Sequence, residues 1–178
     1  MARSLLNALE EEHAAARAAA VSALSHPRYF ALLYRLESTQ PAAVSGVELT
    51  LSDLWREEFE RTRRRFRTLG PRSSDDELHA ARIQVKRARY AAELAEPELG
   101  KRGRRFVAAA KRLQDVLGEH QDACVAEERV RAWATREPGA EALAERLVER
   151  QRARRREARA AWPAAWAELE RRGRRASR

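Results

Sequence analysis

The residue types best suited to chemistry gather in one stretch of the chain, residues 75–96, which reads DDELHAARIQVKRARYAAELAE. At about 100° per residue, one flank of a helix over this stretch carries His79, Arg82, Lys86, Arg89, Tyr90 and Glu93. The first three turns of this flank, here named the cationic stripe (His79, Arg82, Lys86 and Arg89), contain no carboxylate. Such a stripe suits a ligand with several negative charges in a row. A solvated arginine-rich face accounts for the same periodicity, and periodicity alone does not choose between them.

Enzymatic chemistry finds little support in the spacing of the polar residues. The chain has no glycine-rich phosphate-binding loop, and His79 and Cys124 lack the spacing of a nucleophile and its base. The four histidines are scattered with no pair at i and i+4, and Cys124 is the single cysteine. We therefore expect no catalytic residue, no metal site and no cofactor.

Composition predicts an all-α fold. Ala, Leu, Arg and Glu dominate the 178 residues, all four are strong helix formers, and seven Gly and six Pro leave long uninterrupted stretches. A single cysteine excludes an intrachain disulfide. Because no apolar run reaches the length of a membrane span and no signal-peptide pattern opens the chain, we expect a cytoplasmic protein with no membrane partner. Most of the net charge of +9 lies in residues 151–178, so an anion site elsewhere must rest on local segregation of charge.

The helices that must position the stripe can be placed from capping and breaking residues. Helices are expected over about residues 4–24, 27–38, 52–69, 75–96, 101–117, 119–136 and 140–172, with a loop over 41–50. Ser52 is expected to cap the third helix, and Ser74 with Glu77 forms a capping box for the fourth. Gly118 marks a break or a close helix contact, and Pro163 should kink or interrupt the last helix.

An antiparallel helical bundle follows from the apolar faces of these helices. The face of the third helix is strong, with Trp55, Phe59 and Phe66 at its centre. The second helix carries the core candidates Tyr29, Leu32, Leu33 and Leu36. We expect residues 1–136 to form the bundle and residues 137–178 to form a long basic helix packed on it.

Two segments resemble the CHAD family, the conserved histidine α-helical domain. They are LHAARIQVKRARYAAEL (residues 78–94) and KRLQDVLGEHQDACVAEERV (residues 111–130). The matching positions are His79, Arg82, Lys86, Arg89 and Tyr90, followed by Leu113, Gln114, Leu117, Gly118 and Asp122. The resemblance implies a helical bundle that binds inorganic polyphosphate in a basic channel, without catalysis. It also implies association with polyphosphate granules or with a CYTH-type triphosphatase.

The resemblance and the charge pattern together define a set of polyphosphate-binding candidates. These are His79, Arg82, Lys86, Arg89, Lys111, Arg28, Arg65 and Arg104, the last three being the weaker ones. Guanidinium forks and the other cationic donors can follow successive phosphates along a polyanion. For His79 the alternative is a buried neutral imidazole held by a carboxylate.

The resemblance covers only the second half of the family's domain, which consists of two similar four-helix halves. No other His-x-x-Arg segment followed by basic residues occurs in this chain. Half of the channel lining is therefore absent from the sequence. We expect either a fragment of a longer protein, a homodimer that restores the channel, or loss of the function, and weak binding by a monomer.

A different function is suggested by the tail, where arginines precede two tryptophans. Arg152, Arg154, Arg155, Arg156 and Arg159 form a dense run before Trp162 and Trp166. Arginine with tryptophan could bind nucleic acid by holding phosphates and stacking bases. The alternatives are an amphipathic helix whose tryptophans pack on the bundle, which we favour, and a helical scaffold with no anion ligand.

Overall fold

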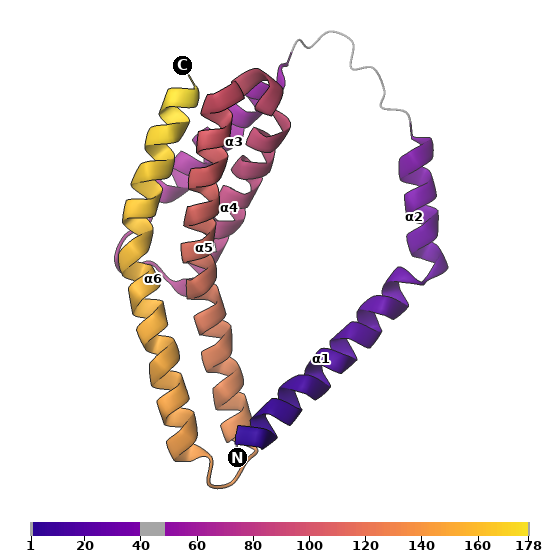
Figure 1. The fold of residues 1–178 in the computed structure, drawn as a ribbon, viewed down its shortest axis with the longest axis vertical. Helices are drawn as coiled ribbons and strands as arrows, with labels where there is room; N and C mark the ends of the chain where they lie inside the picture. Colours follow the sequence, from indigo (N-terminus) through magenta and orange to yellow (C-terminus); the bar gives the residue numbers. More distant parts are fainter. Residues whose placement is uncertain (1, 40–48, 178) are drawn as a thin grey trace. The chain divides into compact units, whose positions relative to one another are not determined.

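The computed structural model describes residues 2–39 and 49–177, and in these ranges the chain is helical and contains no strand. The helices are α1 (Ala2–Leu24), α2 (Pro27–Ser38), α3 (Leu51–Arg67), α4 (Asp75–Leu94), α5 (Glu96–Ala134) and α6 (Glu141–Ala176) (Figure 1). The prediction of an all-α fold is confirmed. The chain divides into two compact units, Met1–Val47 and Glu48–Arg178, which are described separately. None of the described helices is long and apolar enough to cross a membrane.

The first unit contains α1 and α2, and none of its described side chains is buried. His26 caps α2, because its Nδ1 accepts a hydrogen bond from the backbone N–H of Arg28 at 3.1 Å. The prediction of a core on this helix was wrong: Leu32 is 50% exposed and Leu36 is 64% exposed. The physical reason is that α1, rich in alanine and glutamate, offers little apolar surface for α2 to cover.

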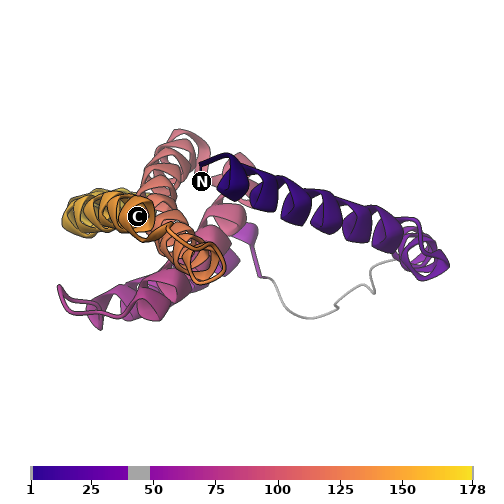
Figure 2. The same cartoon turned by 90° about the horizontal axis from the view of Figure 1, so that it is seen from below.

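The second unit is an up-and-down bundle in which each helix runs antiparallel to the next along the chain (Figures 1 and 2). α4 packs between α3 and α5, and α5 packs along α6. The last turns of α5 and the first turns of α6 continue as a two-helix hairpin beyond α3 and α4 (Figure 1). The bundle part of the fold prediction is thus confirmed in this unit.

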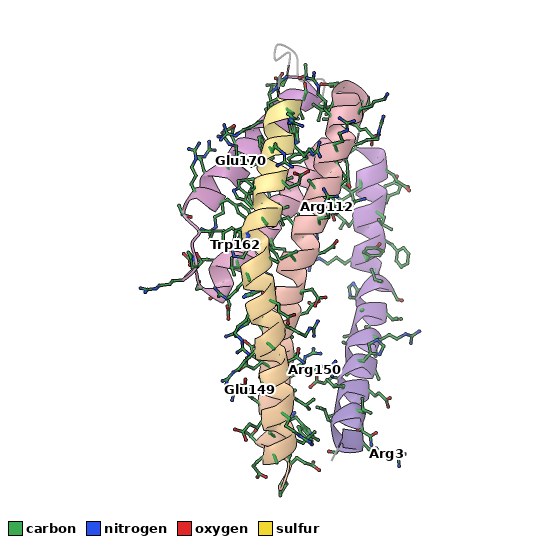
Figure 3. All side chains as sticks on the ribbon, turned by 60° about the vertical axis from the view of Figure 1, so that its left-hand side comes forward. Arg3, Arg112, Glu149, Arg150, Trp162 and Glu170 are labelled. Carbon is green, nitrogen blue, oxygen red and sulfur yellow. The ribbon has the colours of Figure 1, made fainter. Side chains whose placement is uncertain are left out.

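Aromatic rings fill the centre of this bundle. The Trp55 and Phe59 rings of α3 stack with centroids 5.6 Å apart, and Phe106 of α5 meets both edge-on at 5.2 and 5.5 Å. Phe66 stacks on Trp166 at 4.1 Å and lies 5.9 Å from Trp162, which points from α6 toward α3 (Figure 3). The prediction that the two tail tryptophans pack on the bundle is confirmed.

Helix starts follow the capping rules, with one correction. Ser74 and Glu77 form the predicted capping box at the start of α4. α3 is capped by Thr50, whose hydroxyl pairs with Asp53 in a second capping box, and not by Ser52 as predicted. The backbone N–H of Ser52 instead donates to the Glu98 carboxylate at 2.9 Å, so the first turn of α3 is tied to the start of α5. The predicted loop over 41–50 lies outside the described residues, apart from residues 49 and 50.

Neither Gly118 nor Pro163 ends a helix, so the predicted break at Gly118 and the predicted interruption at Pro163 were wrong. α5 continues through Gly118, and its one non-helical residue is Gly100, whose φ of 55° falls in the left-handed region open to glycine. α6 continues through Pro163 without interruption. In each case buried residues flank the expected break, Leu117 and His120 in α5 and Trp162 in α6, so packing on the core holds the helix together.

Candidate functional site

The cationic stripe lies on α4 beside the face that packs in the bundle. The buried residues of that face are Leu78, Ala81, Val85, Ala88 and Ala92. Three of the five are alanines, which allows α4 to lie close to its neighbours. The guanidinium of Arg82 reaches over α5 at Gly118, where an added Cβ would lie 3.7 Å from Arg82 Nε. Gly118 therefore marks a close helix contact, and the stripe lies beside the line along which α4 and α5 pack.

Three members of the stripe have polar side-chain atoms that are buried without a hydrogen-bond partner. These atoms are His79 Nδ1, Arg82 Nε and Arg89 Nε. Across residues 2–39 and 49–177, His79, Arg82 and Lys86 also make no ion pair with a carboxylate. An unpaired buried donor costs free energy, on the order of 1–3 kcal/mol. His79, Arg82 and Lys86 therefore have no carboxylate counter-charge in the described part of the chain.

The end of the stripe is joined to α5 through a single carboxylate. Glu93 lies 3.4 Å from Arg89 Nη1 and 4.0 Å from Lys111 Nζ. The guanidinium of Arg89 lies 4.6 Å from the centre of the Tyr90 ring, and Lys86 Nζ lies 5.7 Å from it. These contacts bring one cation of α4 and one cation of α5 to the same carboxylate.

The remaining predicted site residues, Arg104, Arg65 and Arg28, lie on three different helices. Arg104 shares the Lys111 side of α5, seven residues away, and pairs with Glu96 at 3.2 Å. Arg65 lies on the α3 side of α4, where it donates to the backbone carbonyl of Glu77 at 3.4 Å. Arg28 is exposed on α2 in the first unit. The structure thus joins the stripe to Lys111 through Glu93, shows no contact between Arg104 and α4 among the described residues, and places Arg65 on the α3 side of α4.

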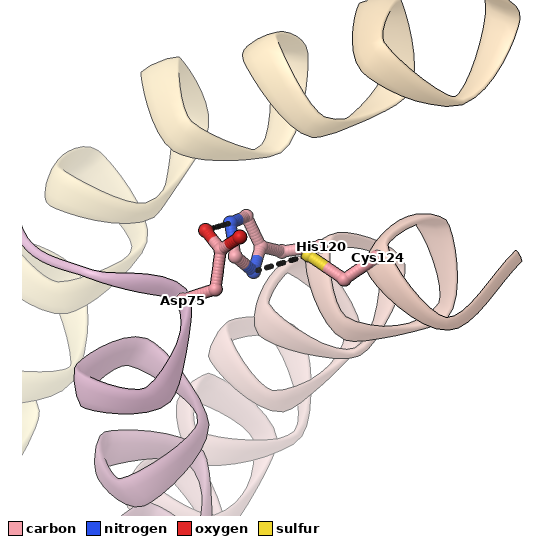
Figure 4. Close-up of side chains that lie close together, drawn as sticks. All are labelled: Asp75, His120 and Cys124. Carbon is pink, nitrogen blue, oxygen red and sulfur yellow. Dashed lines mark hydrogen bonds and ion pairs between the residues drawn. The ribbon is translucent and has the colours of Figure 1, made fainter. Parts of the chain in front are cut away.

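A second polar cluster, which the sequence analysis missed, ties together α4, α5 and α6. Asp75 Oδ1 lies 3.2 Å from His120 Nε2, in an orientation that makes no hydrogen bond, and His120 Nδ1 lies 4.0 Å from Cys124 Sγ (Figure 4). From α6, Arg159 donates to Asp75 at 2.6 Å and Arg155 at 3.3 Å. The only signal in the sequence was the i, i+4 spacing of His120 and Cys124.

Burial and charge set the protonation of this cluster. Burial lowers the pKa of His120 more than the neighbouring Asp75 raises it, so the imidazole is held neutral. Burial raises the pKa of Cys124, and the charge of Asp75 adds to this effect. Burial would raise the pKa of Asp75, but the hydrogen bond from Arg159 and the charge of Arg155 outweigh it and lower the value.

These three side chains could in principle hold a metal ion, because their ligand atoms lie within 4.8 Å of one another. A carboxylate, an imidazole and a thiolate are donors that zinc accepts. Two features oppose it: Asp75 is already bound by two guanidiniums, and the Cys124 thiol is held protonated. The chemistry of the cluster therefore fits a structural clamp between helices.

The arginines of the tail are largely occupied by carboxylates. Arg152 pairs with Glu149 at 2.7 Å, and Arg154 pairs with Glu119 at 2.6 Å. Arg155 and Arg159 both bind Asp75. Because both tryptophans also pack in the bundle, most of the groups proposed for nucleic-acid binding already have partners within the protein.

Fold and site together define an all-α bundle protein with a cationic stripe on one of its helices. A family model described as the CHAD domain matches residues 1–131, and the chain belongs to this family. The CHAD domain is a binding module associated with polyphosphate rather than a catalytic domain. No curated protein and no solved structure matches the chain. The family match ends within α5, so α6 lies beyond it.

Proposed function

We propose that this protein binds inorganic polyphosphate through the cationic stripe of α4, with Lys111 and Arg104 of α5 extending the surface. The observation that carries the proposal is the set of unpaired donors on the stripe. His79, Arg82 and Lys86 have no carboxylate partner in the described residues, whereas most tail arginines do. A protein with many carboxylates that leaves these cations unpaired is arranged for an external anion.

The geometry of a helix suits a linear polyanion. Cations three or four residues apart recur about once per helical turn, roughly every 5.4 Å along the axis. A phosphate chain lying along the cationic stripe would meet a new donor at each turn. Arginine can bind phosphate oxygens through two parallel hydrogen bonds. Glu93 at the end of the stripe would have to share Arg89 and Lys111 with the ligand. The affinity should fall steeply with salt, because binding releases counterions.

Several finer features are part of the same proposal. Arg65 would add a cation from the α3 side of α4, and Arg28 would add one from the first unit. A second copy of the chain, or the other half of the family's domain, would supply further lining residues. The protein would act in the cytoplasm, at polyphosphate granules or beside a CYTH-type triphosphatase.

The test is a titration with long-chain polyphosphate at two salt concentrations, comparing wild type with Arg82→Glu/Lys86→Glu. The matched control is Arg146→Glu/Arg150→Glu, which changes the charge equally at two exposed positions of α6 with the same i, i+4 spacing. We expect the stripe variant to bind far more weakly, and the salt slope of any residual binding to be smaller by roughly one unit for each phosphate that the variant no longer neutralises. The control should bind like wild type.

Heparin and single-stranded DNA serve as competitors in the same titration. Polyphosphate binding that DNA does not displace supports the cationic stripe as the binding site. If the stripe variant binds as tightly as wild type, or DNA displaces polyphosphate with equal affinity, the stripe is not the site.

A further inference from the structure

A second concentration of positive charge lies on another part of the bundle. Arg102 and Arg105 near the start of α5, with Arg172 and Arg175 near the end of α6, line a pocket of about 220 Å³. We call this the arginine pocket. All four side chains that line it among the described residues are cations.

Little negative charge within the protein offsets this pocket. Arg172 Nε donates to Glu168 at 2.7 Å, but Glu168 also binds Arg171 and lies 3.9 Å from Arg112. The other three lining arginines, Arg102, Arg105 and Arg175, are exposed and make no hydrogen bond or ion pair within residues 2–39 and 49–177. One carboxylate is therefore shared among several guanidiniums, and the pocket keeps a net positive charge.

The start of α5 makes this excess of cations unusual. Because Gly100 is non-helical, the helix restarts after it, and residues 101–105 (KRGRR) open the new segment. The first turn of a helix favours negative charge, and cations there are unfavourable. The two nearby acids are occupied, since Glu98 accepts the N–H groups of α3 and Glu96 pairs with Arg104. An anion in the pocket would relieve the repulsion and complement the helix dipole.

The arginine pocket is separate from the cationic stripe. The pocket lies between α5 and α6, whereas the stripe lies beside the contact of α4 with α5. On α5, Lys111 approaches Glu93 of α4 at 4.0 Å, and Arg105 of the pocket lies about 120° around the helix from Lys111. A ligand bound in one place does not occupy the other.

We propose that the arginine pocket is a second anion-binding site, for a small phosphate-class oxyanion. Its volume is below the ~300–1,000 Å³ of pockets for larger organic ligands, so an inorganic phosphate group fits better than a nucleotide. Guanidinium forks from two helices can bind such a group through paired hydrogen bonds. The group comes either from the end of a polyphosphate chain or from a free short phosphate. The proposal does not depend on binding by the stripe.

The test uses inorganic triphosphate as the probe, in isothermal titration calorimetry at low salt. Wild type is compared with Arg105→Gln/Arg175→Gln, with the stripe variant Arg82→Gln/Lys86→Gln and with the charge-matched control Arg146→Gln/Arg150→Gln. We expect the pocket variant to bind triphosphate at least tenfold more weakly than wild type. The stripe variant should keep a triphosphate site, and the control should be unchanged. Equal affinity in the pocket variant and wild type overturns the proposal, as does an equal loss in the control.

A second measurement guards against a folding defect and identifies the source of the anion. Triphosphate should raise the unfolding temperature of the stripe variant but not that of a variant carrying both the stripe and the pocket substitutions, and an equal rise in these two contradicts the proposal. Long-chain polyphosphate with free or esterified ends is then compared on the stripe variant. A loss of binding on esterification assigns the pocket to chain ends. Triphosphate binding without any binding of long chains assigns it to free short phosphates.

Discussion

Replacing Gly173 with alanine tests the packing of α6 on the aromatic core. A Cβ at this position would lie 2.1, 2.3 and 2.6 Å from three atoms of the Phe59 ring. Carbon atoms prefer separations of about 3.5–4.0 Å, so the ring would have to retreat by more than about 1 Å. Phe59 is stacked on Trp55 and met edge-on by Phe106, and all three rings are buried, so the ring has no free space to enter.

Two opposing effects decide the size of the change. Overpacking a core costs about 1–3 kcal/mol, whereas Gly→Ala within a helix contributes up to about 1 kcal/mol of stability. We therefore expect Gly173→Ala to lower the free energy of unfolding by about 1–2 kcal/mol. For a chain of this length, that corresponds to a fall in unfolding temperature of roughly 2–8 °C.

The assay is thermal and urea unfolding followed by circular dichroism at 222 nm. The control is Gly118→Ala, also inside a long helix, where the new Cβ would make an ordinary contact of 3.7 Å with Arg82 Nε. Gly118→Ala should be as stable as wild type or more stable, by up to about 1 kcal/mol. If Gly173→Ala is also as stable as wild type, α6 does not press on Phe59 as the structure shows.

Further predictions concern the cluster around Asp75 and the cap of α4. Because the pKa of His120 is lowered in the folded protein, the unfolded chain binds more protons as the pH falls through the ordinary value of 6.5. The stability that neutral His120 contributes should therefore be complete above pH 6.5 and decline below it. Urea unfolding midpoints at pH 8 and pH 5.5 would measure this decline. The same dependence of the midpoint on pH in His120→Gln would show that His120 is not its cause. Asp75→Asn removes the acceptor of two guanidiniums and should lower the free energy of unfolding by about 1–3 kcal/mol in urea, while Asp76→Asn, exposed beside it, should cost less; equal losses would show that only the helix dipole matters. Ser74→Ala removes the capping hydroxyl, and a loss of about 1 kcal/mol is expected in the same urea experiment, so an unchanged midpoint would mean that the capping box with Glu77 does not stabilise α4.

The sequence predicted correctly those helix ends that depend on residues close together in the chain. The start of α4 followed from Ser74 and Glu77, whose hydrogen bonds span three residues. Of the two alternatives predicted at Gly118, the close helix contact was right, and the break was wrong because a helical glycine costs only about 1 kcal/mol, less than the buried residues on either side contribute. The cap at Ser52 was wrong because Thr50, two residues earlier, offers the same hydroxyl chemistry.

The candidate site was predictable to the extent that one helix contains it. The stripe follows from the periodicity of α4 alone, and Lys111 came from the family resemblance. The Asp75 cluster joins residues up to 84 positions apart, and the arginine pocket joins opposite ends of α5 and α6. No local pattern encodes such pairings, because they depend on how the helices align in the bundle.

The position of α6 shows that the family match and the packed core cover different parts of the chain. The family signature ends at residue 131, within α5. Trp162, Leu169 and Ala176 of α6 nonetheless belong to the same core as Trp55 and Phe106. A protein shortened to residue 131 would keep every residue that the family model matches. Its aromatic core, no longer covered by α6, would face water and tend to self-associate. The residues that the family model matches and the residues that pack into one core are therefore not the same set.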